Sequence, residues 1–292
     1  MEKNAKNLHP RNKFNQSYDI ERLAKNVPDL RKYLLNLYDD QLSVDFTQPE
    51  AVFHLNKALL KTTYGIKGWR ILPNSLVPTV PGRLNYIHYL ADLLGEKKGA
   101  QVHILDIGTG SSLIYPILGV KEYGWSFTGT DTHIPSLTNA KGILKDNPDL
   151  AKQIRLRQQN DSKKILEDMI LPGEYYDAIM CNPPFFKSSE DHAQSVARKN
   201  HNLRISSDAE SNYKGLATEL WTLGGEKKFI TQLIYDSFTF KKQIGYCTTL
   251  VSNKENLKPL RAILEYHKVE DIQVISMNQG NKINRILAWK LS

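Results

Sequence analysis

The nine residues VHILDIGTG, at positions 102–110, indicate the fold class of this chain. Their apolar first half leads directly into Asp106 and then into Gly108 and Gly110, and a second apolar run follows at 113–118. This order is typical of a buried strand, a glycine turn and a helix. Glycine lets the backbone of such a turn approach a ligand closely, as in nucleotide-binding folds. A dinucleotide fingerprint would have a small residue where the second run begins with leucine, which argues against a nicotinamide or flavin site.

Two further polar strand ends follow the glycine turn. The segment Trp125–Thr130 precedes Asp131, which lies about twenty residues after the turn, where an acid at the end of a second strand binds ribose hydroxyls. The alternative is an ordinary solvated aspartate at a strand end. A third polar strand end is expected at Asn160 and Asp161.

A turn rich in proline ends the apolar run Ala178–Cys181. Its residues are Asn182, Pro183, Pro184 and Phe185. The Asn182 amide oxygen and the Pro183 carbonyl can each accept one N–H of an amino group, and Pro184 stiffens the turn because its φ is fixed. Phe185 offers a ring on which an extruded base can stack, a contact worth roughly 1–3 kcal/mol per base. The turn therefore suits aiming the lone pair of a planar amine at an electrophilic methyl group. The alternative is a proline turn that merely ends a strand.

In chain order, the glycine turn, Asp131, the strand end at 160–161 and the Asn-Pro-Pro-Phe turn resemble the S-adenosylmethionine-dependent amino-methyltransferases. The chain is more closely similar to the RNA adenine-N6 methyltransferases, a family that acts on ribosomal large-subunit RNA and, in eukaryotes, on spliceosomal U6 RNA. The segments that carry this resemblance are Pro78–His88, Asp106–Pro116 and Cys181–Phe186. The resemblance, from Asp45 to the C-terminus, implies an α/β class I methyltransferase fold with a mostly parallel seven-stranded sheet. It also implies S-adenosylmethionine as cofactor and the N6 amine of a 23S ribosomal RNA adenosine as target.

The same resemblance suggests roles for individual residues. Those expected around the cofactor are Arg83, Asp106, Gly108, Gly110, Ser112, Asp131 and Asp161, and the expected catalytic turn is Asn182, Pro183, Pro184 and Phe185. Arg83 would approach the carboxylate of the cofactor's methionine part, which a guanidinium can bind with two hydrogen bonds. The enzyme's task is to hold nitrogen, carbon and sulfur in line. The N6 proton can leave after transfer, so we assign no general base, and Asn182 orients the amine.

Composition agrees with an intracellular RNA partner. The 292 residues, 40% of them hydrophobic, can bury one α/β domain and leave room for an accessory part. The net charge of +8 favours a polyanion, expected to be ribosomal RNA, free or in assembly intermediates. Cys181 and Cys247 lie in apolar runs typical of adjacent core strands, which indicates neither a disulfide framework nor a metal site. No apolar run approaches the ~18 residues of a membrane span, and no secretion signal is evident. We expect a cytoplasmic monomer that binds no metal.

The N-terminal part differs from the rest. Residues 1–18 carry four basic side chains against one acidic side chain, and we predict a mobile basic arm that contacts RNA phosphates. The alternative is an ordinary disordered terminus. Apolar spacing predicts two short helices in residues 19–40. Thr47 and Glu50 predict a capping box for a helix that continues through Leu60.

We predict two units, an RNA-binding accessory module at 1–68 and a methyltransferase domain at 69–292. The polar segment 187–225 starts at the catalytic turn and is expected to form a lid that orders on RNA, or else to be disordered, because such long loops are usually one or the other. The elements expected after it are a helix from Lys227, a strand at 244–251, a helix at 255–267 and a strand pair at 269–275 and 285–290.

Two other interpretations stay open. An enzyme of the same fold could methylate guanine N2 or a protein glutamine; a duplicated domain or an N-terminal helical bundle built for release factors would favour it, and neither is evident. An RNA-binding protein with a decayed methyltransferase fold is disfavoured, because Asp106, Gly108, Gly110, Asp131 and Asn182 are all present.

Overall fold

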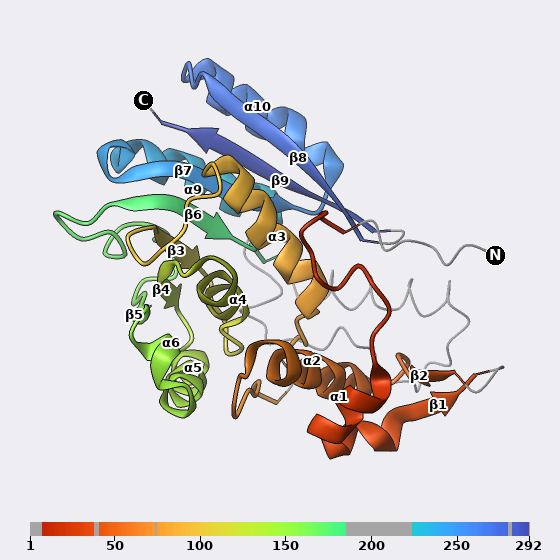
Figure 1. Cartoon of the computed structure of the whole chain (residues 1–292). Coiled ribbons are helices and arrows are strands. Elements are labelled where there is room, and N and C mark those ends of the chain that lie inside the picture. The colour runs from red at the N-terminus through yellow and green to blue at the C-terminus, as the bar shows by residue number, and fades with distance from the viewer. Residues whose placement is uncertain (1–7, 38–40, 74, 185–223, 280–281, 292) are drawn as a thin grey trace.

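A seven-stranded sheet in the order β5-β4-β3-β6-β7-β9-β8 forms the centre of the protein (Figure 1). Its strands are β3 His103–Ile107, β4 Ser126–Asp131, β5 Ile154–Gln158, β6 Tyr176–Cys181, β7 Ile244–Val251, β8 Asp271–Gln279 and β9 Lys282–Lys290. The five strands from β5 to β7 are parallel, and β9 runs antiparallel to both of its neighbours. This computed structural model describes residues 8–37, 41–73, 75–184, 224–279 and 282–291. The predicted class I α/β fold is confirmed.

Successive residues of the inner strands contribute to two separate cores. In β3, Ile104 belongs to one cluster and Leu105 to the other, and Ala178 and Ile179 divide in the same way in β6. Side chains alternate between the two faces of a strand, and a parallel sheet is covered on both faces. The apolar runs of the sequence are therefore continuous because both of their faces are buried.

Helices cover both faces of the sheet (Figure 1). On one side lie α3 Val80–Leu93, α4 Ile114–Tyr123 and α5 Ile134–Asp146, whose apolar residues join the cluster that contains Ile104. On the other side lie α9 Gly225–Thr239 and α10 Leu257–Tyr266. The short elements between them are α6 Pro148–Ala151, η3 Lys241–Gln243 and η4 Lys254–Asn256. The helices and strands expected after residue 225 are confirmed, although β8 and β9 extend further toward each other than predicted, with Gln279 opposite Lys282.

The N-terminal elements pack on the same core as the sheet. They are α1 Ile20–Asn26, η1 Pro28–Tyr33, β1 Leu34–Asn36, β2 Leu42–Val44 and α2 Pro49–Tyr64. Leu23 of α1 and Leu59 of α2 belong to one cluster with Leu84 of α3 and Ile104 of β3. The accessory part is thus joined to the larger part by buried apolar contacts, and the boundary at residue 68 stays a prediction.

Two local predictions in this part need correction. Both short helices expected within 19–40 are present as α1 and the 3-10 helix η1, but the second ends at Tyr33. Residues 34–36 instead form β1, which pairs antiparallel with β2, because strand pairing overrides the helical spacing of the leucines. The capping box is absent, since Thr47 donates from both its backbone nitrogen and its hydroxyl to Asp45. Helix α2 begins at Pro49 with no side-chain cap and continues to Tyr64.

The sequence predicts a mobile basic arm at residues 1–18, but its described residues, 8–18, are packed against the rest of the protein. Leu8, Asn12 and Phe14 are buried. Arg11 forms ion pairs with Asp92 and Glu96, and Lys13 forms one with Glu122. These basic side chains have acidic partners on α3, on the residues just after it and on α4, which local composition does not reveal.

Among the described residues, no helix is long and apolar enough to cross a membrane. In the same ranges, no group of three or more histidine, cysteine, aspartate or glutamate side chains is arranged to hold a metal ion. Cys181 and Cys247 are buried free thiols on the neighbouring strands β6 and β7.

Candidate active site

Three strand ends meet at one edge of the sheet and open into a cavity. Ile107 of β3 lies opposite Thr130 of β4 on one side and Cys181 of β6 on the other. The residues just beyond these ends turn toward one another because the strands are parallel and in this register. The cavity is lined by Leu76, Pro78, Arg83, Ile107, Gly108, Thr109, Gly110, Ser111, Ser112, Ile114, Tyr115, Thr130, Asp131, Thr132, Gln159, Ser162, Lys164, Ile165, Cys181, Asn182, Pro184 and Phe229.

The glycine turn forms the floor of this cavity. Gly108 and Gly110 have φ angles of +72° and +68°, a region that favours glycine. A Cβ atom added at either position would meet no other atom within 4 Å, so both glycines face open space. The backbone N–H groups of Gly108 and Thr109 donate to the Thr130 carbonyl at 2.9 and 2.8 Å, which fastens the turn to β4. The turn can therefore receive a ligand against bare backbone.

Asp106 lies buried at the end of β3, 1% exposed. Neither of its carboxylate oxygens has a hydrogen-bond partner among the described residues. The pKa of Asp106 is raised to about 7, mainly by burial and also by the charge of Asp131. The nearby Thr109 hydroxyl, without hydrogen-bond geometry, and Arg83 act in the opposite direction. A buried carboxylate that no other group compensates is costly, and it suits a cationic ligand group.

Asp131 ends β4 and lines the cavity beside the glycine turn. One carboxylate oxygen accepts a hydrogen bond from Gly110 N at 2.9 Å and the other accepts one from His133 N at 2.9 Å. Burial raises the pKa of Asp131, and the two backbone donors lower it in part. Each oxygen keeps a second lone pair for a ligand hydroxyl.

Arg83 projects from the first turns of α3, which leads into β3 as the sequence indicated. Its Nη1 donates to the hydroxyl of Tyr115 on α4 at 2.7 Å, and both residues line the cavity. Ser112 lines it too, while its carbonyl accepts a hydrogen bond from the Trp69 indole at 2.9 Å. The structure thus brings Arg83 and Ser112 to the same space as the glycine turn.

Asp161 does not line the cavity. Its carboxylate accepts from the backbone of Lys163 at 2.9 Å, and its own N–H donates to the Gln159 side chain at 3.0 Å. Gln159 and Ser162, on either side of the predicted pair 160–161, line the cavity instead. Sequence reasoning missed both residues. Residue types indicate that the strand end is polar, but they do not indicate which of its side chains point into the cavity.

The predicted catalytic turn follows the end of β6, and its residues Asn182 and Pro184 line the cavity. The side-chain oxygen Oδ1 of Asn182 is buried and has no hydrogen-bond partner among the described residues. Pro183 is buried and Pro184 lines the cavity, whereas Phe185 and nearly all of the predicted lid lie outside the described residues. Phe229 of α9 adds an aromatic ring to the lining, and no sequence signal separated it from the core-facing residues of its helix.

Tyr86 of α3 contacts the end of β6, directly before the turn. The Tyr86 hydroxyl accepts a hydrogen bond from the backbone N–H of Cys181 at 3.4 Å and contacts the Thr248 hydroxyl at 2.9 Å. Tyr86 is fully buried, and its ring packs edge-on against Tyr115, with centroids 5.5 Å apart. The end of β6, directly before Asn182, is therefore linked through Tyr86 to Tyr115, the hydrogen-bond partner of Arg83.

These features fit S-adenosylmethionine at separate points. The open glycine turn suits a close backbone approach, and Arg83 suits a carboxylate. Asp106 is not itself among the lining residues, but its carboxylate, without a hydrogen-bond partner in the described ranges, suits an ammonium. The unpartnered oxygen of Asn182 remains to accept the N–H of a second, incoming group.

Comparisons with known proteins agree with this arrangement. A family model described as RNA methyltransferase matches residues 2–292. The chain is 45% identical over 288 residues to the ribosomal RNA large subunit methyltransferase F of Klebsiella pneumoniae (strain 342), covering 97% of this chain and 94% of the relative. It is 44% identical over 299 residues to the protein of the same name from Bacteroides fragilis (strain YCH46), covering 97% and 98%.

Two human structures are similar to the whole described fold. One is the catalytic domain of METTL16 in complex with MAT2A 3'UTR hairpin 1, with a TM-score of 0.86 and 32% identity over 98% of this chain and 96% of that one. The other is the N-terminal domain of METTL16 in complex with SAH, with a TM-score of 0.78 and 30% identity over 98% and 99%. With a family match over nearly its whole length and relatives that are 44–45% identical to it, this chain belongs to the RNA methyltransferase family.

Proposed function

We propose that this enzyme methylates the N6 amine of a specific adenosine in 23S ribosomal RNA, with S-adenosylmethionine as the methyl donor. The observation that carries the proposal is the buried Oδ1 of Asn182, which has no hydrogen-bond partner in the part of the chain that the structure describes and belongs to the same cavity as the open turn at Gly108 and Gly110. An acceptor for a target amine and a turn for a nucleotide-like cofactor thus share one space. The names of the bacterial relatives support ribosomal RNA as the substrate.

Each of the residues around the glycine turn is proposed to bind a different group of the cofactor. When bound, S-adenosylmethionine supplies a methyl group that its sulfonium already activates. Arg83 would bind the carboxylate of the methionine part, and Asp106 would bind its ammonium. Asp131 would accept from the ribose hydroxyls through the lone pairs that Gly110 N and His133 N leave free.

The residues of the catalytic turn act on the target base. Asn182 Oδ1 and the Pro183 carbonyl accept the two N–H groups of the amine and so aim its lone pair into the cavity. As the nitrogen forms its new bond it becomes positively charged, and its hydrogen bonds to these oxygens strengthen. The proton then leaves from an acidic nitrogen, which is why no general base is assigned. Phe185 is proposed to stack on the base, with Phe229 contributing a second ring.

RNA is proposed to be gripped by the accessory module at 1–68 and by a lid at 187–225. The lid, with five basic and five acidic side chains, has no net charge and is assigned by its position directly after the proposed catalytic turn. The accessory module carries eleven basic against eight acidic side chains, and this net positive charge supports its contact with RNA phosphates. So does the complex of human METTL16 with an RNA hairpin, because the likeness covers 98% of this chain and includes the N-terminal part. We propose that the protein acts as a monomer in the cytoplasm, on free ribosomal RNA or on assembly intermediates.

Cofactor affinity is expected to depend on pH through Asp106. Its pKa of about 7 in the empty site means that the carboxyl is mostly protonated at pH 6, whereas only the ionised form attracts an ammonium. The dissociation constant for S-adenosylhomocysteine should therefore be about tenfold higher at pH 6 than where Asp106 is fully ionised. Calorimetry between pH 5.5 and 8 measures this. In the Asp106→Asn variant the dissociation constant should no longer change with pH, apart from the contribution of the ligand's own titration. The same pH dependence in both proteins would contradict the assignment of Asp106 to the ammonium.

Mass spectrometry of nucleosides from the RNA of a strain that lacks this gene tests the proposed reaction. N6-methyladenosine at one site of 23S ribosomal RNA should disappear, and should return with the wild-type gene but not with Asn182→Ala. Loss of N2-methylguanosine instead, or an unchanged nucleoside profile, would contradict the adenosine assignment.

A further inference from the structure

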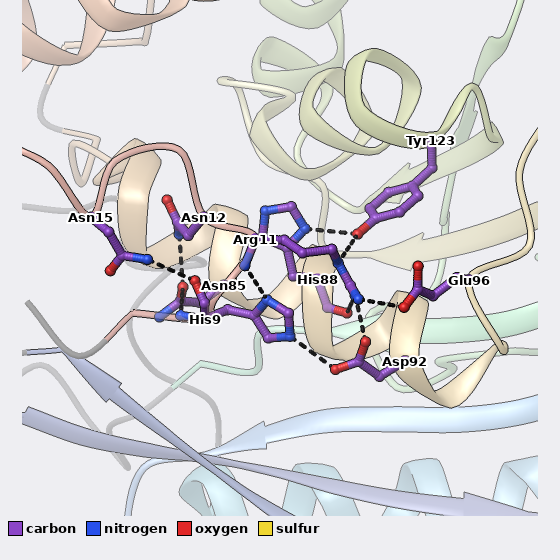
Figure 2. Close-up of polar contacts among 9 residues, drawn as sticks. All are labelled: His9, Arg11, Asn12, Asn15, Asn85, His88, Asp92, Glu96 and Tyr123. Carbon is purple, nitrogen blue, oxygen red and sulfur yellow. Dashed lines mark hydrogen bonds and ion pairs between the residues drawn. The ribbon is translucent and has the colours of Figure 1, made fainter.

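Residues 8–15 form a strap that lies along helix α3, the helix that carries Arg83. Figure 2 shows His9, Arg11 and Asn12 of this strap among polar side chains from α3 and α4. The strap is well packed, since Leu8, His9, Asn12 and Phe14 are all buried. Its contacts divide into two groups, one at each end of the helix.

The first group surrounds the turn from which Arg83 projects. The buried side chain of Asn12 donates through Nδ2 to the Pro81 carbonyl at 2.9 Å and to the Asn85 side-chain oxygen at 2.7 Å. The backbone N–H of His9 donates to the same Asn85 oxygen at 3.0 Å. Pro81 and Asn85 lie two residues before and two residues after Arg83, so Asn12 holds the helix on both sides of the arginine.

The second group anchors the strap at the far end of α3. Arg11 bonds to Asp92 and Glu96, to the His88 carbonyl at 3.1 Å and to the Tyr123 hydroxyl of α4 at 3.1 Å (Figure 2). His9 Nε2 contacts Asp92 at 2.9 Å. This end joins α3 to α4, the helix whose Tyr115 receives the hydrogen bond of Arg83.

Within Asn12, the two ends of the amide have different tasks. Its Oδ1 accepts from the backbone N–H of Phe14 at 3.0 Å, which shapes the strap itself. Its Nδ2 makes both contacts with α3. A change from asparagine to aspartate would therefore remove the contacts with the helix and keep the contact within the strap.

We propose that this strap is a positioning element of the cofactor site, in which Asn12 fixes the first turns of α3 and thereby the reach of Arg83 toward the cofactor's carboxylate. The proposal rests on the role assigned to Arg83 above. A guanidinium binds a carboxylate bidentately only in a narrow range of positions, and small displacements in an active site are costly. Tyr115 holds the end of the arginine side chain, and Asn12 holds Pro81 and Asn85, which lie on either side of the arginine in the helix. The N-terminal segment thus serves cofactor binding in addition to any contact with RNA.

Calorimetry of the full-length protein with two ligands tests this proposal. S-adenosylhomocysteine carries the amino-acid part that Arg83 would bind, and 5'-methylthioadenosine lacks it. Asn12→Ala should raise the dissociation constant for S-adenosylhomocysteine about fivefold, the effect of one or two lost hydrogen bonds, and leave that for methylthioadenosine unchanged. Asn12→Asp serves as a second variant of nearly unchanged shape and should behave in the same way. An equal loss for both ligands, or no loss for either, would overturn the proposal.

Asn15→Ala is the matched control within the strap. Asn15 donates to the His9 carbonyl at 2.9 Å, and none of its hydrogen bonds within the described ranges reaches α3. Its substitution should change neither dissociation constant by more than about twofold. A fivefold loss in this control would mean that any disturbance of the strap weakens binding, and would overturn the role of Asn12.

A double-mutant cycle with Arg83→Ala separates this proposal from the assignment on which it rests. In the Arg83→Ala background the Asn12 substitution should have no further effect on S-adenosylhomocysteine, because the group that it positions is gone. Additive losses would overturn the positioning role while leaving Arg83 in the site. If Arg83→Ala alone left the affinity unchanged, the assignment of Arg83 would fail, and the proposal with it.

Discussion

Asn182→Ala is expected to lower kcat for methyl transfer by about a thousandfold, as does removal of a preorganised polar group that acts in the transition state. The reason is that Asn182 Oδ1, buried and without another partner in the described part of the chain, is the atom available to hold the amine. Its hydrogen bond gains strength as the nitrogen becomes positive, so the loss falls on the transition state more than on binding. Single-turnover measurements with labelled cofactor and target RNA check this.

Cofactor affinity provides the control for this variant. The dissociation constant for S-adenosylhomocysteine should stay within about tenfold of the wild-type value, because the lost contact is with the target. Asn182→Asp should also be a poor enzyme, although a carboxylate can accept from an amine. A near wild-type rate in the alanine variant would remove Asn182 from its role.

Asp106→Asn is expected to weaken S-adenosylhomocysteine binding by about 30-fold or more, because truncating one partner of a buried charge pair is expensive. The same change should leave the empty protein as stable as the wild type or more so. Asp106 has a folded-state pKa of about 7, above the usual carboxyl value, so its ionised form costs stability as pH rises from about 4 through 7. Asparagine removes that cost while keeping the shape.

Two measurements check this prediction. Calorimetry gives the affinity, and thermal unfolding at pH 8 without ligand gives the stability. The wild-type melting temperature should rise strongly with S-adenosylhomocysteine and that of Asp106→Asn only weakly, since stabilisation follows ligand affinity. Unchanged affinity would show that Asp106 is a structural residue; lower stability of the empty variant would show that its carboxylate has a partner in the fold.

Much of the site was predictable because its parts are local in sequence. The strand, glycine turn and helix at 102–118 depend on residues within a few positions of one another, and Gly108 and Gly110 have the positive φ angles expected there. The class I topology then requires the ends of β3, β4 and β6 to meet, which brings Asp131 and Asn182 to the same edge. Asp161 shows the limit of this reasoning, because the direction of a side chain just after a strand depends on its local hydrogen bonds.

The N-terminal part illustrates what local patterns cannot reveal. Leu34 has the spacing of a helix, but its pairing with Val44 makes it part of a strand. The charges of Arg11 and Lys13 suggested a free arm, but both side chains have acidic partners more than 80 residues away in the chain.

Residue types and their spacing were thus sufficient for the fold class, for the glycine turn and for the amide that is proposed to hold the target amine, because strands, turns and prolines act over short distances in the chain. The burial that raises the pKa of Asp106, and the strap that holds the helix of Arg83, arise only when distant segments pack together. Asn12 and Asn85 are 73 residues apart in the sequence and 2.7 Å apart in space. Such a contact follows from the packing of the whole chain, since nothing in the sequence around either asparagine indicates that the other will be its partner.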